Sequence, residues 1–401
     1  MRILLVHQNM PGQYRHVAPA LVRAGHEVIF VTQREDLNLP GVRRVTYKPP
    51  RTATESTHHY TRLYENSVIV GQQVARVMIE LERQALTPDV IVAHPGWGEV
   101  LFAKDVFPQV PLLNYCEFYY AGRGADIGFS PEDPATIDAI CRARARNAHL
   151  LLSLEAADAG VSPTHWQKSR HPAPLSDKIE VIFDGIDTAT VKPDAQARFE
   201  LEDGRVLTAQ DEVLTYGGRN LQPYRGFPSF IRALPKILGE RPDLTVLICG
   251  GDEVSYGKPA PDGKTWREHM LAETGLDLSR VHFTGKLPYS RYLSLLQVSS
   301  LHLYLTVPFV LSWSCLEAMA AGCLMLGSAT PPVREVLEDG VNGWLCDFND
   351  PEDIAAKAIS MLADRARLAH LREAARATVL ERYALDLCLP RHLAKITAMA
   401  G

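Results

Sequence analysis

The chain has 401 residues, of which 46% are hydrophobic and 22% are charged, so it is long enough for two globular domains of ordinary size. Its formal net charge of −5, without a dense basic run, argues against a nucleic-acid-binding protein. Its seven cysteines include no CxxC pair and lie mostly in apolar runs, which favours buried thiols in a reducing compartment over zinc ligands or disulfide bonds.

The first half of the chain alternates short apolar runs with helical patterns. Strands are expected over residues 3–6, 26–32, 89–94, 111–116 and 149–154. Helices are expected over residues 17–25, 68–84, 99–106 and 135–147. Because the strands are continuously apolar rather than alternating, the pattern predicts a parallel sheet covered by helices on both faces.

The N-terminal run MRILLVHQNM is too short for a signal peptide, and no later run approaches the length of a membrane span. We therefore expect a cytoplasmic protein, for which peripheral contact with a membrane stays open. The turn after the first strand contains Gly12 but not the GxGxxG dinucleotide fingerprint, and the chain has no Walker A motif.

A second series of strands and helices starts near residue 212. Its expected strands are EVLTYGG, LTVLICGG, VHFTGKL, LHLYLT and LMLGS. The two series join around residues 178–194, where Asp-Gly and Lys-Pro interrupt the chain. The sequence thus predicts an α/β protein with two Rossmann-like doubly wound domains, residues 1–186 and 187–380, facing a cleft at their strand ends.

One acid, Glu317, stands in the otherwise apolar and small-residue segment FVLSWSCLEAMAAGC. Ser314 and Glu317 fit the Ser-x-x-Glu capping box of a helix start, and Gly322 is expected to end that helix in a left-handed conformation. Alternatively, Glu317 faces a ligand at the helix N-terminus, where free N–H groups and the helix dipole favour anions. The local pattern alone favours the capping box.

Two arginines, Arg219 and Arg225, follow an expected strand and the pair Gly217-Gly218 in the segment YGGRNLQPYRG. Glycine permits close approach of the backbone to a ligand, and arginine offers forked donors, so the segment suits a diphosphate. A solvated loop with two surface arginines fits the local pattern at least as well.

Two further candidate groups lie at expected strand ends. His94 ends one strand, and Glu117 ends the next, among several aromatic residues. Either side chain could orient a substrate hydroxyl or accept its proton, and either could equally be a hydrogen-bonded loop residue. The chain has no HExxH, DxD or 2-His-carboxylate spacing, so no metal site is predicted.

Taken in order, several segments resemble family 4 (group 1) of the retaining glycosyltransferases, which have the GT-B fold. KIEVIFDGID is similar to the family's NGID segment, YGGRNLQPYRGF resembles its GR-L---KG motif, and ICGGDE and VHFTGKL match two further strands. The most specific match is CLEAMAAGCLMLGSATPPVREVLEDGVNGWLC, which follows the family pattern LEAMA-G-PV--S--GG--E-V-DG-NG-L. The resemblance covers nearly the whole chain.

The resemblance implies an enzyme that moves a sugar from a nucleotide-sugar to an acceptor hydroxyl, with retention at the anomeric carbon and without a metal or other cofactor. The second domain would hold the donor. The first domain would present an acceptor of unspecified kind, whether a glycan, a lipid-linked molecule or a small molecule. Residues 381–401 would form a terminal helix that crosses back to the first domain.

Individual site residues are carried over from the family motifs. Arg219 matches a phosphate-binding arginine, Arg225 lies near a family lysine, and Glu317 takes the place of the second glutamate of the E-x7-E motif, which contacts the ribose. The two arginines, with His94 and Glu117, make up the predicted catalytic set. The predicted donor-binding residues are Gly12, Gly218, Arg219, Arg225, Lys286, Leu287, Leu311, Ser312, Trp313, Ser314 and Glu317.

The chain departs from the family pattern at Phe309, which stands where the E-x7-E motif has its first glutamate, and at Ser312, which replaces a glycine. The usual hydrogen bond from that glutamate to the donor sugar is therefore missing. Two alternative functions follow: a sugar-nucleotide 2-epimerase on the same fold, or a non-catalytic subunit that binds a nucleotide-sugar. The nucleotide base, the sugar and the acceptor are not predicted.

Overall fold

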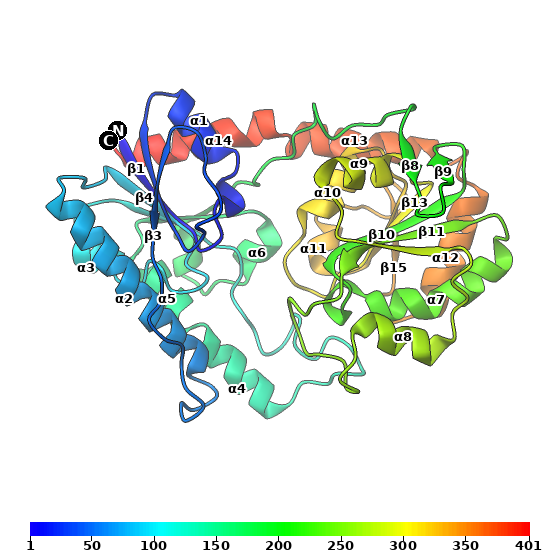
Figure 1. Ribbon diagram of the computed structural model, residues 1–401, viewed down its shortest axis with the longest axis horizontal. Helices are drawn as coiled ribbons and strands as arrows, with labels where there is room; N and C mark the ends of the chain where they lie inside the picture. Colours follow the sequence, from blue (N-terminus) through cyan, green and yellow to red (C-terminus); the bar gives the residue numbers. More distant parts are fainter. The chain divides into compact units, whose positions relative to one another are not determined.

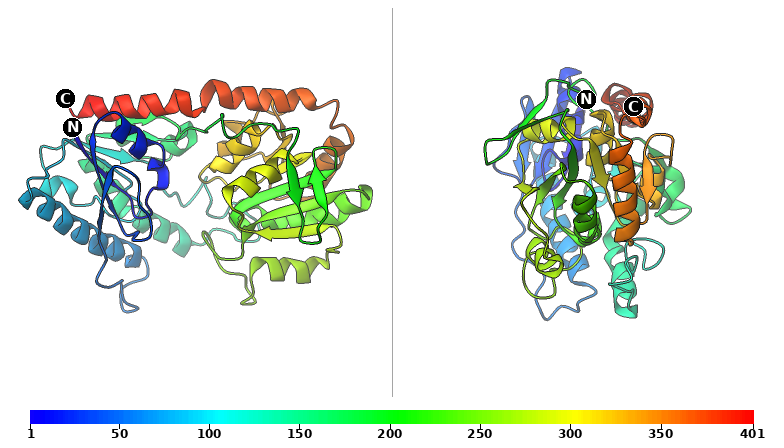
Figure 2. Two further views of the ribbon diagram at one scale, coloured as in Figure 1. Left: turned by 45° about the horizontal axis from the view of Figure 1, so that its top comes forward. Right: turned by 90° about the vertical axis from the view of Figure 1, so that its right-hand side faces the viewer.

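The computed structural model describes residues 1–401, which divide into two compact units. Unit 1 consists of Met1–Gly128, Asp133–Gly185 and Asp386–Gly401, and unit 2 consists of Phe129–Glu132 and Ile186–Leu385. The chain thus starts and ends in unit 1, where the last helix, α14 (Leu385–Met399), lies beside the N-terminal segment (Figures 1 and 2).

Unit 1 is built on a parallel sheet of seven strands in the order β3-β2-β1-β4-β5-β6-β7. The strands are β1 (Arg2–Val6), β2 (Glu27–Thr32), β3 (Val42–Thr46), β4 (Val90–Ala93), β5 (Leu112–Tyr115), β6 (Ala159–Ser162) and β7 (Ile179–Val181). The other helices of this unit are η1 (Gly12–Tyr14), α1 (Val17–Arg23), α2 (Arg62–Arg83), α3 (Ala103–Val106), α4 (Ile137–Arg146), α5 (Ala148–Ala156), α6 (His165–Ser169) and η2 (Leu175–Lys178).

Both faces of this sheet are buried, because successive side chains of each strand point to opposite sides. On one face, Leu5 of β1 belongs to a core cluster with Leu21 of α1 and Ile396 of α14. On the other face, Leu4 of the same strand belongs to a cluster with Met78 of α2. The predicted parallel sheet with two covered faces is therefore confirmed for this half of the chain.

Three expectations for unit 1 differ from the structure. Residues 149–154 form part of helix α5 and not a strand, and the strand lies later, at β6. A short apolar run cannot be assigned to helix or strand from periodicity alone, and here His149 and Ser153, one turn apart, are the buried side. Only Ala103–Val106 of the expected helix at 99–106 is helical, and the edge strand β3, with two arginines in five residues, was not predicted.

Unit 2 contains a parallel sheet of six strands in the order β12-β11-β10-β13-β14-β15, and a separate antiparallel pair, β8 with β9. The strands are β8 (Arg198–Glu200), β9 (Val206–Thr208), β10 (Val213–Asn220), β11 (Thr245–Gly251), β12 (Val281–Gly285), β13 (Leu301–Tyr304), β14 (Met325–Ser328) and β15 (Trp344–Cys346). The helices are η3 (Pro223–Arg225), α7 (Phe227–Glu240), α8 (Trp266–Thr274), α9 (Tyr289–Gln297), α10 (Trp313–Ala320), α11 (Pro331–Arg334), α12 (Pro351–Ala363) and α13 (Ala369–Arg382).

The two sheets share one topology, which confirms the prediction of two Rossmann-like halves. In each, the chain builds outward in one direction and then returns to the other side of its first strand. The reversal falls between β1 and β4 in unit 1 and between β10 and β13 in unit 2. Ligands of open α/β sheets bind at the carboxyl ends of the strands at such a reversal, so each unit has one edge where a site is expected.

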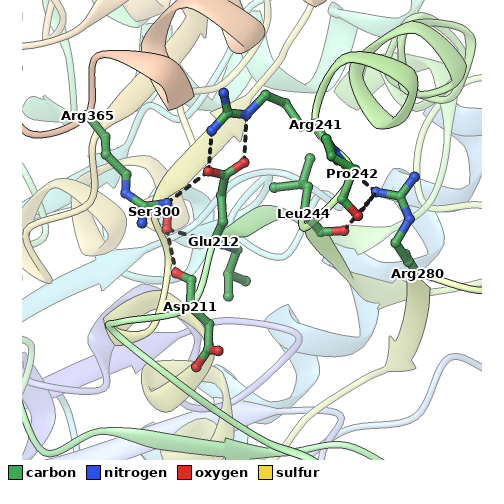
Figure 3. Close-up of polar contacts among 9 residues, drawn as sticks. Asp211, Glu212, Arg241, Pro242, Leu244, Arg280, Ser300 and Arg365 are labelled. Atoms are coloured by element: carbon green, nitrogen blue, oxygen red, sulfur yellow. Dashed lines mark hydrogen bonds and ion pairs between the residues drawn. The ribbon is translucent and has the colours of Figure 1, made fainter.

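A polar network fixes the opposite end of the unit 2 sheet (Figure 3). Glu212, just before β10, accepts hydrogen bonds from Arg241 Nε at 2.8 Å and from Arg365 Nη1 at 3.0 Å. Arg280, just before β12, donates to the carbonyls of Arg241, Pro242 and Leu244. These carbonyls follow the end of α7, where unpaired acceptors and the helix dipole both favour a cation.

Six of the seven cysteines are buried and Cys141 is half-buried, as their place in apolar runs predicts. None of the helices has both the length and the apolar character needed to span a bilayer.

Candidate functional site

His94 and Glu117, the predicted acceptor-side pair, lie close together in unit 1. His94 follows β4 and is 3% exposed, and its Nε2 atom is 3.4 Å from Oε2 of Glu117, which follows β5. Its Nδ1 atom accepts a hydrogen bond from the Gly96 N–H at 3.0 Å. The neutral ring therefore carries its proton on Nε2, and this N–H has no hydrogen-bond partner closer than the Glu117 carboxylate.

His7, which follows β1, completes this edge of the sheet at the reversal of strand order. Its ring lies 5.0 Å from the ring of His94 and 5.3 Å from that of Trp97, measured between centroids. Burial, followed by the proximity of His94, lowers the pKa of His7 to about 3, so the ring is neutral at physiological pH. His7 belongs to none of the motifs in the sequence, although its place directly after the first strand is a usable signal.

Gly12 lies against His7 in a way that explains why a glycine occupies the turn. Its φ angle is +51°, and a Cβ atom at this position would lie 2.5 Å from Nε2 of His7. A side chain there would therefore be strained and would displace the ring. The structure gives Gly12 this packing role, and its predicted contact with a donor stays a prediction.

A pocket of about 450 Å³, counted with the solvent at its mouth, opens beside Glu117. Its walls are mainly aromatic, aliphatic and histidine side chains, joined by Asn114 and Cys116. Glu117 is the one carboxylate among the lining residues, which include no lysine or arginine. The lining residues are His94, Pro95, Gly96, Asn114, Tyr115, Cys116, Glu117, Phe118, Tyr120, Leu150, Leu154 and His171. The Glu117 side chain is 36% exposed, so its carboxylate can contact a molecule in the pocket.

A second carboxylate, Glu99, is buried behind this site and holds the loop that carries Gly96. It is 1% exposed and accepts hydrogen bonds from Tyr47 Oη at 3.0 Å and from the Trp97 N–H at 3.2 Å. Burial raises the pKa of Glu99 to about 7, although its hydrogen bonds and the proximity of His94 act in the opposite direction. Near neutral pH, Glu99 therefore changes between its neutral and charged forms.

This shift predicts a loss of stability as the pH rises from about 4.5 to about 7, which Glu99→Gln removes. The raised pKa of Glu99 stabilises the fold below its unfolded value of 4.5, and this contribution is lost as pH rises through about 7. The difference corresponds to about 3 kcal/mol in the free energy of unfolding between pH 5 and pH 9. Urea denaturation of wild type, Glu99→Gln and the exposed control Glu82→Gln at both pH values measures it. A Glu99→Gln variant with the wild-type pH dependence would contradict the assignment.

Arg219 and Lys286 lie at the strand ends of unit 2, where the donor is predicted to bind. Arg219, near the end of β10, is exposed, and its guanidinium makes no hydrogen bond or ion pair among the described residues. Lys286, after β12, is 2.8 Å from the Glu253 carboxylate. The hydrogen bond from Lys286 and the positive charges of Lys286 and Arg219 lower the pKa of Glu253.

Arg225 is held more firmly than Arg219, by neutral oxygens only. Its Nη1 atom donates to Tyr304 Oη at 3.2 Å, Thr306 Oγ1 at 2.9 Å and the Val310 carbonyl at 3.1 Å. Gly218 lies beside it, because a Cβ atom there would be 3.8 Å from Cγ of Arg225. No carboxylate lies within ion-pair distance of this half-buried guanidinium, so its charge is uncompensated by the protein.

The predicted capping box of α10 is wrong, because the helix begins two residues earlier than the pattern suggested. Ser312 is the N-cap residue, and its Oγ accepts a hydrogen bond from the Ser314 N–H at 3.3 Å. Glu317 therefore lies in the second turn of the helix, where it cannot cap it. It is 5% exposed and accepts a hydrogen bond from Tyr289 Oη at 2.9 Å.

The carboxyl end of α10 is as predicted. Gly322 has a φ angle of +79°, and the N–H groups of Gly322 and Cys323 donate to the carbonyls of Met319 and Ala318. Arg376 of α13 donates to the Ala320 carbonyl, and Arg372 to that of Gly322 at 2.6 Å. The helix that carries Glu317 is thus fixed at both ends.

The remaining predicted donor residues surround this helix start and the end of β12. The Ser312 N–H donates to Tyr304 Oη at 2.9 Å, which also accepts from Arg225. Leu311 is 3% exposed, and Trp313 opens the helix. Leu287 lies between Lys286 and α9, whose first residue, Tyr289, reaches Glu317. Hydrogen bonds to Tyr304 thus connect the segment before α10 with Arg225. The hydrogen bond from Tyr289 connects Glu317 with the segment after β12.

Phe309 is packed in an aromatic cluster that the sequence did not reveal. It is 4% exposed, and its ring lies 5.5 Å from that of Tyr224 and 5.1 Å from that of Tyr256. Gln222 fixes the loop that carries Tyr256, because its Oε1 atom accepts from the N–H groups of Ser255 and Tyr256. The residue in place of the family glutamate is therefore part of an apolar wall next to Arg225.

Comparison with known proteins agrees with this architecture. A family model described as "Glycosyl transferase family 4 group" matches residues 24–191, and one described as "Glycosyl transferases group 1" matches residues 201–378. The D-inositol 3-phosphate glycosyltransferase of Mycolicibacterium vanbaalenii is 28% identical over 63% of this chain and 55% of that protein. The chain therefore spans about half the length of that relative.

Two other proteins are matched over most of their length. The glycogen synthase of Mycobacterium tuberculosis is 25% identical over 94% of this chain and 89% of that protein. The crystal structure of Anabaena HepE in complex with UDP and glucose has a TM-score of 0.68 and 16% identity, and the match covers 99% of this chain and 100% of that one. With two consecutive glycosyltransferase models and two sheets of one topology, the chain belongs to the group 1 glycosyltransferases of the GT-B fold.

Proposed function

We propose that the protein transfers a sugar from a nucleotide-sugar to the hydroxyl group of an acceptor. Unit 2 holds the diphosphate of the donor through Arg219 and Arg225 and its ribose through Glu317. Unit 1 receives the acceptor in the pocket beside Glu117 and His94. The reaction retains the configuration of the anomeric carbon and uses no metal ion or other cofactor.

The uncompensated charge of Arg225 is the observation that carries this proposal. A half-buried guanidinium without a carboxylate partner costs free energy unless an anion binds there for part of the time. Nη1 donates hydrogen bonds to two hydroxyls and a carbonyl. The other N–H groups of the guanidinium make no hydrogen bond with the protein. These donors can contact a diphosphate and stabilise the negative charge that builds on it as its bond to the sugar breaks.

The comparisons supply the first compounds to test. The HepE structure contains UDP and glucose, and another relative is named for an inositol phosphate substrate. UDP-glucose is therefore the first donor to examine, together with the GDP- and ADP-linked sugars. A cytoplasmic location is part of the proposal, because seven free cysteines, six of them buried, suit a reducing compartment.

Arg219→Ala is expected to weaken nucleoside diphosphate binding without unfolding the protein. Arg219 is exposed at the end of β10, so its removal leaves the core unchanged, whereas a charge-assisted contact to phosphate contributes roughly 1.5–3 kcal/mol. Isothermal titration with UDP, GDP and ADP, with the exposed Arg198→Ala of β8 as control, measures the loss. Equal affinity of the Arg219→Ala and wild-type proteins would show that Arg219 does not contact the diphosphate.

The aromatic surroundings of Phe309 favour one competing function, a subunit that binds a nucleotide-sugar without turning it over. The aromatic cluster of Phe309, Tyr224 and Tyr256 lies next to Arg225 and offers rings for stacking. Phe309 itself has no hydrogen-bonding group that could hold the sugar in a reactive position. Such a subunit would bind UDP-glucose tightly and release no UDP with any acceptor. A 2-epimerase would instead return an altered sugar nucleotide in the absence of acceptor.

A further inference from the structure

Gln13, which follows the first strand, joins two parts of unit 1 that are far apart in the sequence. Its Nε2 atom donates to Oε1 of Glu117 at 3.0 Å, and its Oε1 atom lies 2.7 Å from Nε2 of His7. The amide therefore connects the loop after β1 with the residue after β5. Glu117 has one carboxylate oxygen tied to this glutamine and the other facing His94.

The direction of these hydrogen bonds is fixed by the backbone. The Asn9 N–H donates to Nδ1 of His7 at 2.9 Å, so the neutral His7 ring carries its proton on Nε2 and donates it to the Gln13 carbonyl oxygen. The Gln13 amide group then has to face Glu117 with its NH₂. Burial lowers the pKa of His7 to about 3, so the ring stays neutral and this arrangement holds throughout the physiological pH range.

His94 faces the same carboxylate with an N–H that is not fully used. Nδ1 of His94 accepts from the Gly96 N–H, so the ring cannot serve as a proton acceptor at that atom. Nε2 is buried, 3.4 Å from Glu117 Oε2, and has no other partner. A buried donor beside a half-exposed acceptor suits a group that accepts one hydrogen bond and donates another, such as a hydroxyl.

We propose that Gln13 is a positioning residue that orients Glu117 so that, with the His94 Nε2–H, the carboxylate binds an uncharged hydroxyl of the acceptor. The hydroxyl oxygen accepts a hydrogen bond from His94, and the hydroxyl group donates a hydrogen bond to Glu117. The absence of lysine and arginine from the pocket lining makes the bound part of the acceptor uncharged rather than phosphorylated. This inference rests on the proposed function, because it places the acceptor in the unit 1 pocket.

Two substitutions of Gln13 separate its effects. Gln13→Met keeps the length of the side chain and removes both hydrogen bonds, so Glu117 loses its orientation. Gln13→Glu keeps an acceptor for His7 but places a second carboxylate beside Glu117, and two carboxylates at this distance do not both ionise readily. Gln73→Glu, on the half-exposed side of α2, is the matched control for an added carboxylate in the same unit.

The first measurement is ¹³C NMR titration of the glutamate carboxyl groups, with the Glu117 resonance assigned through Glu117→Gln. Its midpoint is expected to move up by at least 1 pH unit in Gln13→Glu and to stay at the wild-type value in Gln73→Glu. An unchanged midpoint in a folded Gln13→Glu protein overturns the positioning role. This readout does not require turnover, so it decides the role of Gln13 even if the proposed transfer reaction is wrong.

The second measurement is the acceptor KM with UDP-glucose as donor and glucose or myo-inositol as acceptor. Gln13→Met is expected to raise the acceptor KM about tenfold and to change UDP affinity much less, since the proposed function places the diphosphate and ribose on Arg219, Arg225 and Glu317 of unit 2. An unchanged acceptor KM overturns the inference. A wild-type protein that releases no nucleoside diphosphate from any nucleotide-sugar contradicts the proposed function instead.

Discussion

Replacing Arg225 with alanine is expected to lower kcat/KM about 10²–10³-fold, the usual effect of removing one donor that stabilises charge in a transition state. The guanidinium sits at the reversal of strand order in unit 2 and has N–H donors to spare for the diphosphate. The same change removes its hydrogen bonds to Thr306 and Val310, so a fall in unfolding free energy of about 1–3 kcal/mol should accompany it.

Arg225→Lys separates charge from geometry in this experiment. Lysine keeps the positive charge but cannot hold Tyr304, Thr306 and the Val310 carbonyl with one nitrogen while pointing further donors at a ligand. We expect it to recover part of the nucleotide affinity and little of kcat. Steady-state kinetics with thermal denaturation of both variants makes the comparison. A folded Arg225→Ala enzyme with wild-type kcat/KM would show that the diphosphate binds elsewhere.

Glu317→Ala is expected to weaken nucleotide binding by roughly tenfold to a hundredfold, since a hydrogen bond to a charged group contributes roughly 1.5–3 kcal/mol. The carboxylate is 5% exposed in the second turn of α10, where it has no capping role. It accepts from Tyr289 and retains capacity for a ribose hydroxyl, because a carboxylate offers about four acceptor positions. Titration calorimetry with UDP measures the effect.

Ser312→Ala provides the structural control for this prediction. Ser312 is the true N-cap of α10, so its replacement should cost about 0.5–2 kcal/mol of stability. Although Ser312 is among the predicted donor-binding residues, the loss of UDP affinity should be clearly smaller than that of Glu317→Ala. Tyr289→Phe removes the hydrogen bond from Tyr289 to Glu317 and leaves the carboxylate in place, so the UDP affinity of this variant should stay close to that of wild type. If Glu317→Ala loses only as much affinity as Ser312→Ala, the ribose assignment is wrong.

Much of the fold was predictable because its strands are buried on both faces. Continuous apolar runs such as Ile3 to Val6 have few alternatives in a chain that alternates them with helical patterns. The errors occurred where that rule fails. The run at residues 149–154 is apolar but forms α5, and the edge strand β3 carries two arginines because solvent covers one side of it.

The candidate site was only partly predictable, because its geometry depends on long-range contacts. His94 and Glu117 were found from their places at strand ends, and the structure brings them within 3.4 Å of each other. Gln13 had no local signature, since its partner Glu117 is 104 residues away. The Glu317 capping box matched a local pattern, but the helix start was set by Ser312 and its neighbours in the folded chain. The donor contacts of the individual residues stay predictions.

The most direct test of the account is analysis by mass spectrometry of the products formed from UDP-, GDP- and ADP-sugars with a pool of sugars, polyols and lipid extracts. The proposed function predicts that one donor yields a nucleoside diphosphate and an equimolar glycosylated product, in amounts that a chelator does not change. Tight binding of a nucleotide-sugar without release of nucleoside diphosphate, or an altered sugar nucleotide without a glycosylated product, would contradict it.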